Sequence, residues 1–174
     1  MTPSELAQAA QLGDTAAFSA LMNMHYHRLY RIARAYLRDE EDTLEVIQEA
    51  TYRAYSKLKS LRKPEMFGSW ITRILLNCCA REYRHRQKFR PLPMQDLHEQ
   101  GSWDHPEDPD LAAAIDALSH DHKQVIILSY FEGLSLTETA VILGIPAGTV
   151  KSRLHRALGQ LRKQLDIGGD DSDD

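Results

Sequence analysis

The stretch Gly133–Leu165, GLSLTETAVILGIPAGTVKSRLHRALGQLRKQL, is the part of the chain that most clearly predicts its fold. Its pattern predicts two helices that meet at a tight corner. Ser135 is a typical helix N-cap, and Glu138 three residues later completes a capping box. Gly144 is typical of a left-handed helix end, and Pro146 prevents the first helix from simply continuing. The stretch therefore has the sequence pattern of a helix-turn-helix.

The second helix, expected from Thr149 onward, has one apolar side and one basic side. Its apolar residues recur at helical spacing and predict one buried stripe, made of Val150, Leu154, Leu158, Leu161 and Leu165. The other side carries Lys151, Ser152, Arg153, His155 and Arg156. A helix-turn-helix of this kind places its second helix in a major groove of DNA. The alternative is a helical hairpin with a solvated basic face, but the corner, the cap and the cluster of bases together favour DNA binding.

A chain of 174 residues is long enough for one ordinary domain or two small ones. No apolar run is long enough to cross a bilayer, and the N-terminus lacks the pattern of a signal peptide, so we expect a cytoplasmic protein. The adjacent Cys78 and Cys79 are interpreted as small apolar residues of a helix in a reducing compartment. We expect no metal site.

The net charge of −4 is unusual for a nucleic-acid-binding protein until it is mapped along the chain. Residues 91–110 contain six acids and residues 166–174 contain five, and neither segment has a Lys or Arg. Without those eleven acids the net charge changes from −4 to +7. The bases concentrate in Arg81–Arg90 and Lys151–Lys163, with five in each cluster. This segregation indicates two basic surfaces and two acidic segments.

No strand-like alternation is visible, so the predicted fold class is all-α, with two small helical domains joined by a flexible acidic linker. Pro91 and Pro93 end the first domain, and Asp110 is expected to cap the first helix of the second. The predicted divisions are a domain at 1–90, a linker at 91–110, a helix-turn-helix domain at 111–167 and an acidic tail at 168–174. The expected helices are Ser4–Ala10, a long helix capped by Asp14, a helix over about 45–58, one from Gly68 into the basic run, and His120–Phe131, with a polar break at 38–42.

Three motifs occur in a characteristic order: DTLEVIQEATYRAYSKL at 42–58, FGSWITRILLNCCAREYRHRQK at 67–88, and EGLSLTETAVILGIPAGTVKSRLHRA at 132–157. In this order the chain resembles sigma factors of the sigma-70 family, in the small extracytoplasmic-function (ECF) group that keeps only conserved regions 2 and 4. The resemblance implies that the first domain is region 2 and the helix-turn-helix domain is region 4. It also implies a subunit that binds RNA polymerase core and directs transcription initiation.

The resemblance further implies sites for the partners. The helix at 42–58 would dock on the β′ clamp helices of core polymerase, and the matching polar positions are Glu45, Gln48, Glu49 and Arg53. From the residues alone, a solvated helix face is the favoured interpretation of these four. The β flap of core polymerase is a second implied contact of the protein. An anti-sigma factor, which in this family is often membrane-anchored, is also implied. No cofactor and no small-molecule substrate are expected.

The segment matching Leu61–Arg84 would melt and hold the −10 promoter element, with one base flipped into the loop between Lys59 and Phe67. The candidate −10 residues are Arg62, Lys63, Phe67, Arg73, Asn77, Arg81, Arg84 and Arg86. Asn77 is suited to a base edge or sugar, and the arginines are suited to phosphates. Trp70 could stack on a base, but its helical register with Ile74 favours a core position.

In the fourth region, the resemblance implies that the −35 element is read from the helix-turn-helix, with candidate residues Thr149, Lys151, Ser152, Arg153, His155 and Arg156. Lys151 and Arg156 are the expected base readers, because Lys and Arg pair with guanine O6 and N7. Arg153 is expected to contact a phosphate or an acidic partner, and Thr149 to orient a phosphate at the helix N-terminus.

Three positions depart from the family pattern. Arg81 stands where an acid is frequent, Thr51 where an aromatic residue is usual, and Ser119 where proline is usual. The change at Arg81 leaves the −10 preference open. Two other function classes compete with the sigma factor. One is a stand-alone helix-turn-helix regulator whose N-terminal domain senses or dimerises, and the other is an enzyme, which the scattered histidines and the lack of a phosphate-binding glycine loop argue against.

Overall fold

The structure is a computed structural model that describes residues 1–89 and 108–165. The chain divides into two compact units, residues 1–99 and residues 100–174. The described residues form helices joined by short turns and contain no strand, which confirms the prediction of an all-α fold. None of the helices in these two ranges has the length and apolar character that crossing a membrane would require.

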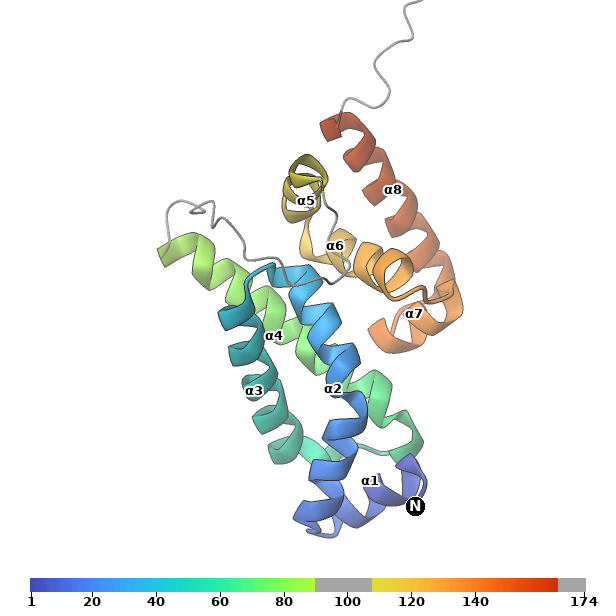
Figure 1. Ribbon diagram of the computed structural model, residues 1–174. Coiled ribbons are helices and arrows are strands. Elements are labelled where there is room, and N and C mark those ends of the chain that lie inside the picture. Colours follow the sequence, from blue (N-terminus) through green and yellow to red (C-terminus); the bar gives the residue numbers. More distant parts are fainter. Residues whose placement is uncertain (90–107, 166–174) are drawn as a thin grey trace, which may run out of the picture. The chain divides into compact units, whose positions relative to one another are not determined.

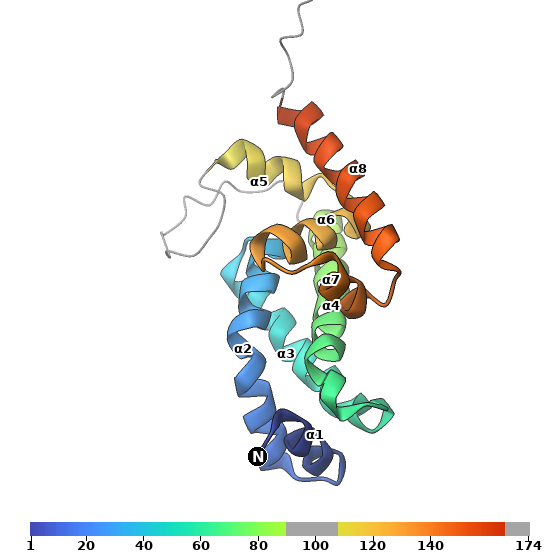
Figure 2. The same cartoon turned by 90° about the vertical axis from the view of Figure 1, so that its right-hand side faces the viewer.

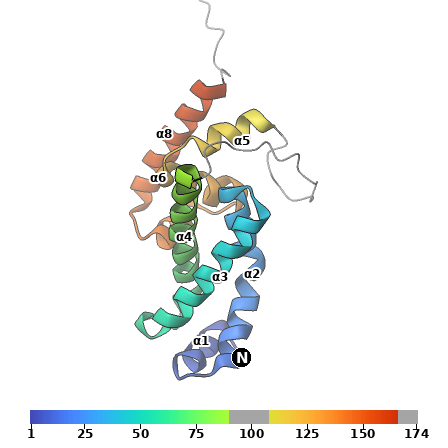
Figure 3. The same cartoon turned by 90° about the vertical axis from the view of Figure 1, so that its left-hand side faces the viewer.

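Unit 1 is a bundle of three long helices with a short helix at one end (Figure 1). The long helices pack against one another side by side, as Figure 3 shows from a second direction. The short helix packs against the first long helix and against the loop that leads into the last one. The elements are α1 (Pro3–Gln11), α2 (Thr15–Leu37), α3 (Glu40–Lys57), the 3-10 turns η1 (Leu58–Ser60) and η2 (Pro64–Met66), and α4 (Phe67–Phe89).

The helix boundaries in unit 1 follow local capping chemistry. Asp14 caps α2 as predicted, since its carboxylate accepts a hydrogen bond of 3.0 Å from the amide of Ala17. The polar break predicted at 38–42 is wrong, because only two residues separate α2 from α3. Arg38 ends α2 in the left-handed conformation with φ 59°, and Asp39 caps α3 through the amide of Asp42. The three acids that follow are stable in the first turn because they face the positive end of the helix dipole.

The core of unit 1 is built where the long helices meet. Large side chains such as Leu29, Tyr36 and Leu75 are buried there, while Ala50 and Ala54 of α3 allow that helix to lie close to its neighbours. The two cysteines are buried in α4, as predicted, and burial raises the pKa of the Cys78 thiol. Trp70, predicted to lie in the core, is half-buried.

Arg86 connects all three long helices at one end of the bundle. One nitrogen of its guanidinium, Nη1, donates to the carbonyl of Leu37 at 2.9 Å and to the carboxylate of Asp42 at 3.1 Å. Its charge also lies over the ring of Tyr83, 5.6 Å from the ring centre. Asp42 is 1% exposed, so its charge is stabilised inside the protein by this contact. The side chain of Arg86 is thus bound within unit 1, and its contact with a DNA phosphate stays a prediction.

Unit 2 consists of short helices packed on one side of a long C-terminal helix (Figure 2). The elements are α5 (Pro109–Asp116), α6 (His120–Ile126), a π-helical turn η3 (Ile127–Phe131), α7 (Leu136–Leu143) and α8 (Ala147–Leu165). The helix at His120–Phe131 was predicted as one element, and the structure ends it with the π-helical turn. Ser119 caps α6 by accepting a hydrogen bond of 3.4 Å from the amide of His122.

The start of unit 2 differs from the prediction in its cap. Asp108, and not Asp110, caps α5, since its side chain accepts a hydrogen bond of 2.9 Å from the amide of Asp110. Pro109 can occupy the first helical position because that position needs no amide donor. The predicted linker at 91–110 therefore includes two residues that are helical. Its residues 91–107 and the predicted tail at 168–174 lie outside the described residues.

The helix-turn-helix corner forms as the sequence predicts. Ser135 accepts a hydrogen bond of 3.1 Å from the amide of Glu138, and Gly144 ends α7 with φ 66°. The second helix begins at Ala147, two residues before the predicted Thr149, because the amides of Thr149 and Val150 already bond to the carbonyl of Pro146.

The apolar stripe of α8 packs into two clusters. Val150 packs with Val125 of α6 and Ala140 of α7, which fixes the corner. Ala157 and Leu161 pack with residues of α5 and α6. Ala157 is 0% exposed and was absent from the predicted stripe, because its small side chain does not stand out in a hydrophobic pattern. The basic side of α8 is thereby turned away from the core of unit 2.

The Arg86 contact generates a prediction about stability. Replacing Arg86 with Ala should lower the free energy of unfolding of unit 1 by about 2–4 kcal/mol, because the buried Asp42 carboxylate loses its compensating charge. Urea unfolding followed by Trp70 fluorescence, in a Trp103→Phe background, measures this. Arg84→Ala removes an exposed arginine from the same helix and should change the value by less than about 0.5 kcal/mol. Equal effects of the two substitutions would contradict the role given to Arg86.

Candidate nucleic-acid and polymerase interfaces

One face of α4 carries a row of exposed polar and basic side chains. Arg73, Asn77, Arg81 and Arg84 follow one another at spacings of four, four and three residues, so they share one side of the helix. All four belong to the predicted −10 set, and all four are exposed. Lys88 continues the row one turn beyond Arg84 and was missed, although the same spacing could have identified it. We call these five residues the α4 basic face.

Two further candidates lie in the loop before α4. Arg62 and Lys63 are exposed between η1 and η2, where they are accessible to a nucleic acid. Phe67, in contrast, is 2% exposed and packs against the rings of His25 and Trp70 at centroid distances of 5.5 and 5.8 Å. Phe67 therefore supports the loop from beneath, and its predicted contact with DNA stays a prediction.

His25 of α2 fixes how closely the start of α4 approaches. A Cβ atom at Gly68 would lie 2.9 Å from Cε1 of His25, so only glycine allows this approach without a shift. Burial lowers the pKa of the His25 imidazole, and the positive charge of Arg28 lowers it further. Both effects favour the neutral form of the His25 ring where α2 packs against α4.

The exposed face of α3 carries the predicted polymerase-binding residues. Glu45, Gln48 and Glu49 are exposed, while Arg53 is half-buried and donates from Nε to the Glu49 carboxylate at 2.6 Å. These four residues lie on consecutive turns of one helix, so the structure brings them together. We call them the α3 polar face.

A shallow groove of about 520 Å³ runs between α2 and α3 beside that face. Its lining includes Gln48, Thr51 and the exposed rings of Tyr26, Tyr52 and Tyr55. The hydroxyl of Thr51 donates to the carbonyl of Ile47 at 2.7 Å.

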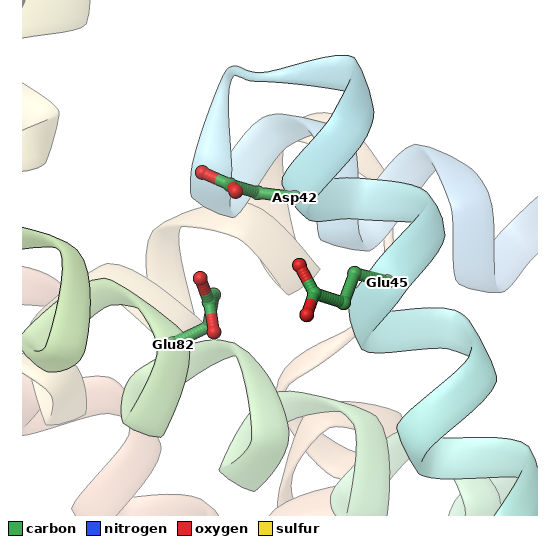
Figure 4. A group of neighbouring side chains, drawn as sticks. All are labelled: Asp42, Glu45 and Glu82. Atoms are coloured by element: carbon green, nitrogen blue, oxygen red, sulfur yellow. The ribbon is translucent and has the colours of Figure 1, made fainter.

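Three carboxylates gather where α3 approaches α4 (Figure 4). One oxygen from each of Asp42, Glu45 and Glu82 lies within 4.8 Å of the others. Positive charge beside them is already supplied by Arg86, which binds Asp42. Because Asp42 is already paired with Arg86, we assign no metal to the group. The exposed Glu45 and the half-buried Glu82 make the surface at the start of the α3 polar face acidic.

The outward face of α8 carries the predicted −35 residues. Lys151, Ser152, His155 and Arg156 are exposed, and Ser152 donates to the carbonyl of Gly148 at 3.0 Å. Thr149 is half-buried in the first turn of α8, where the helix dipole favours a phosphate. Arg153 differs from the others, because its Nη1 lies 3.8 Å from the Asp121 carboxylate of α6. Lys151, Ser152, His155 and Arg156 form what we call the α8 reading face.

Models of two protein families match the two units. Sigma-70 region 2 matches residues 21–89, and sigma-70 region 4 matches residues 114–163. The chain belongs to the sigma-70 family of RNA polymerase sigma factors. Its relatives are sigma factors over nearly the whole chain, so a stand-alone helix-turn-helix regulator is not favoured. The protein is a promoter-specificity subunit of the ECF group. Helix α1 lies outside the matched region 2.

The relatives come from several bacteria. RNA polymerase sigma factor SigV of Bacillus subtilis is 37% identical over 143 residues, which cover 81% of this chain and 86% of SigV. ECF RNA polymerase sigma factor SigM of Mycobacterium tuberculosis is 30% identical over 164 residues, which cover 93% of this chain and 84% of SigM. Among structures, CnrH in complex with the cytosolic domain of CnrY matches with a TM-score of 0.69 and 26% identity, over 96% of this chain and 99% of that one.

The packing of His25 in this sigma factor generates a prediction about pH. Because the folded pKa lies below the unfolded value of about 6.5, the unfolded chain binds more protons as the pH falls through that range. The free energy of unfolding should therefore fall below about pH 6.5, by at most about 1.4 kcal/mol per pH unit. Urea unfolding followed by circular dichroism from pH 7.5 to 5.5 measures the slope. His25→Phe should flatten it, whereas the same exchange at the exposed His27 should leave the wild-type slope.

Proposed function

We propose that this sigma factor divides the promoter between its units, so that unit 1 opens the −10 element and unit 2 reads the −35 element. The observation that carries the proposal is the presence of two exposed basic faces, one on α4 and one on α8, in units that match regions 2 and 4. Each face lies on a helix whose opposite side is buried, so each is held rigidly toward solvent.

At the −10 element, the α4 basic face neutralises phosphates while Asn77 contacts a base edge or sugar. The loop that carries Arg62 and Lys63 receives the flipped base. Extruding a base costs a few kcal/mol of stacking and pairing, which contacts to its edge and backbone return. Phe67 contributes by supporting the loop, because its ring is buried. Arg86 contributes by holding the bundle together.

At the −35 element, Lys151 and Arg156 of the α8 reading face are the base readers. Both are exposed, and Lys or Arg paired with guanine O6 and N7 contributes about 1–3 kcal/mol of discrimination when the contact is bidentate. Thr149 orients a backbone phosphate at the start of α8. Arg153 is assigned to a phosphate or an acidic partner, and its proximity to Asp121 restrains it for that role.

The α3 polar face is assigned to the β′ clamp helices of core polymerase, and unit 2 to the β flap. Exposure of Glu45, Gln48 and Glu49 on one helix supports this docking face. The exposed Glu45 and the half-buried Glu82 beside it suit a basic partner surface. The sigma factor itself performs no catalysis and uses no cofactor, and it works in the cytoplasm, where its polymerase and promoters are.

An anti-sigma factor is the proposed regulator. The related CnrH was determined in complex with the cytosolic domain of a second protein, which supports a protein partner of this kind for the present chain. Such a partner would cover surfaces that polymerase also needs. Affinity purification of the tagged sigma factor from uninduced cells should recover it, and recovery of no stable partner would count against the proposal.

Reconstitution with polymerase core tests the main proposal. The holoenzyme should give run-off transcripts from a subset of a randomised promoter library, while the free protein binds duplex DNA weakly. Gln48→Lys should weaken core binding, because it adds a positive charge to the α3 polar face. Gln8→Lys makes the same exchange on exposed α1 and should leave core affinity unchanged. Tight and specific duplex binding with no core association would refute the proposal.

The α8 reading face generates a separate prediction. Lys151→Ala should reduce discrimination at one −35 base by a free energy of about 1–3 kcal/mol, because one base contact is lost. Arg162→Ala removes an exposed base from the last turn of the same helix, and it should alter only overall affinity and its salt dependence. Selection from the promoter library with each holoenzyme measures both. A uniform loss across all −35 sequences for Lys151→Ala would reassign Lys151 to a phosphate.

A further inference from the structure

The last residue of α1 is hydrogen-bonded to the loop that precedes α4. The side-chain amide of Gln11 donates to the carbonyl of Leu58 at 3.1 Å and to the carbonyl of Leu61 at 2.7 Å. Leu58 is the first residue of η1, and Leu61 is the residue directly after the end of η1. The two bonds join segments that lie 47 and 50 residues apart in the sequence. They therefore fix the loop against α1 through one side chain.

Leu61 is held at three points. Its side chain is buried, its amide donates to the carbonyl of Leu58 at 3.1 Å, and its carbonyl accepts from Gln11. Arg62 and Lys63 follow immediately and are exposed. Helix α1 also packs against η2, on the other side of these two residues. Both ends of the exposed turn are thus anchored on α1.

The position of Gln11 is itself fixed. Helix α1 begins with a capping box at Thr2 and Glu5, and Ala7 and Ala10 are buried beneath it. At its other end, Gly13 donates to the carbonyl of Ala10 at 3.0 Å in the turn that leads to α2. Because both ends of α1 are fixed, the side-chain amide of Gln11 has a defined position, which a residue that positions a loop requires.

We propose that Gln11 is a positioning residue for −10 recognition, holding the loop at 58–66 in the shape that receives the flipped base. The inference rests on the proposed role of that loop. Binding then needs little reordering of the backbone, so that a correct base is distinguished more sharply from an incorrect one. Gln11 touches no DNA in this mechanism, and it acts through the carbonyls of Leu58 and Leu61.

The chemistry of the contact provides a matched set of variants. Gln11→Ala removes the donor, and Gln11→Glu replaces it with a carboxylate that faces two carbonyl oxygens. Gln11→Lys retains a donor, since its ammonium group can bond to carbonyls. Gln8→Glu makes the same change in charge at an exposed position of α1. A role that depends on donation predicts that Lys rescues function and Glu does not.

The experiment is run-off transcription by each holoenzyme on a library randomised at the −10 and −35 elements. In Gln11→Ala and Gln11→Glu, discrimination at the flipped base should fall about three- to tenfold, the size expected when hydrogen bonds to backbone carbonyls are lost. The −35 preference and the affinity for core should stay at the wild-type level. Gln11→Lys and Gln8→Glu should remain within about twofold of wild type.

Hydrogen exchange of the amides at 58–66 provides the second readout. Exchange should accelerate in Gln11→Glu and stay unchanged in Gln8→Glu. Wild-type selectivity in Gln11→Glu, or a parallel loss of −35 preference and core binding, would overturn the inference. If the wild-type holoenzyme itself shows no −10 preference, the proposed function is refuted. If amide hydrogen exchange at 58–66 is unchanged in Gln11→Glu, the positioning role of Gln11 is refuted separately.

Discussion

The contact between Arg86 and Asp42 is the interaction on which the arrangement of unit 1 depends. A carboxylate that is 1% exposed is costly unless an opposite charge accompanies it, and Arg86 supplies that charge from another helix. The same guanidinium also donates to the carbonyl of Leu37, the last residue of α2, and would lose this hydrogen bond if it moved away. One side chain therefore joins the end of α2 and the first turn of α3 to the last turns of α4. The α4 basic face and the α3 polar face take their positions from this arrangement.

Helix α4 illustrates how one element serves both the core and the DNA. Its buried side, with Ile71 and Leu75, packs into the bundle, and Arg86 lies on the side that faces the other helices. Its opposite side carries the α4 basic face. Because successive side chains of an α-helix are separated by 100°, the four arginines of α4 divide between the two roles. Helix α8 follows the same rule, with its apolar stripe in two clusters and its reading face in solvent.

The loop before α4 is supported from two sides by residues distant in sequence. Gln11 of α1 bonds to the carbonyls at its start, and His25 of α2 packs against Phe67 at its end. The close approach of His25 to Gly68 leaves the chain little freedom there. An exposed turn with anchored ends can present Arg62 and Lys63 in a defined place, which is what selection of one extruded base requires. Unit 2 meets the same need more simply, since its reading residues lie on a helix.

The sequence by itself determined the helical class, the cap at Asp14, the helix-turn-helix corner and both basic faces, because all of these arise from residues within a few positions of one another. It misplaced local boundaries where two solutions compete, as with Asp108 and Asp110, or where a run of acids at 38–42 resembles a loop but suits a helix N-terminus. Only the tertiary structure decided the fates of Arg86 and Phe67 and the contacts of Gln11. The guanidinium of an arginine can bind a DNA phosphate or a buried carboxylate equally well. The choice is made by Asp42, 44 residues away, and such a partner is known only once the helices have packed.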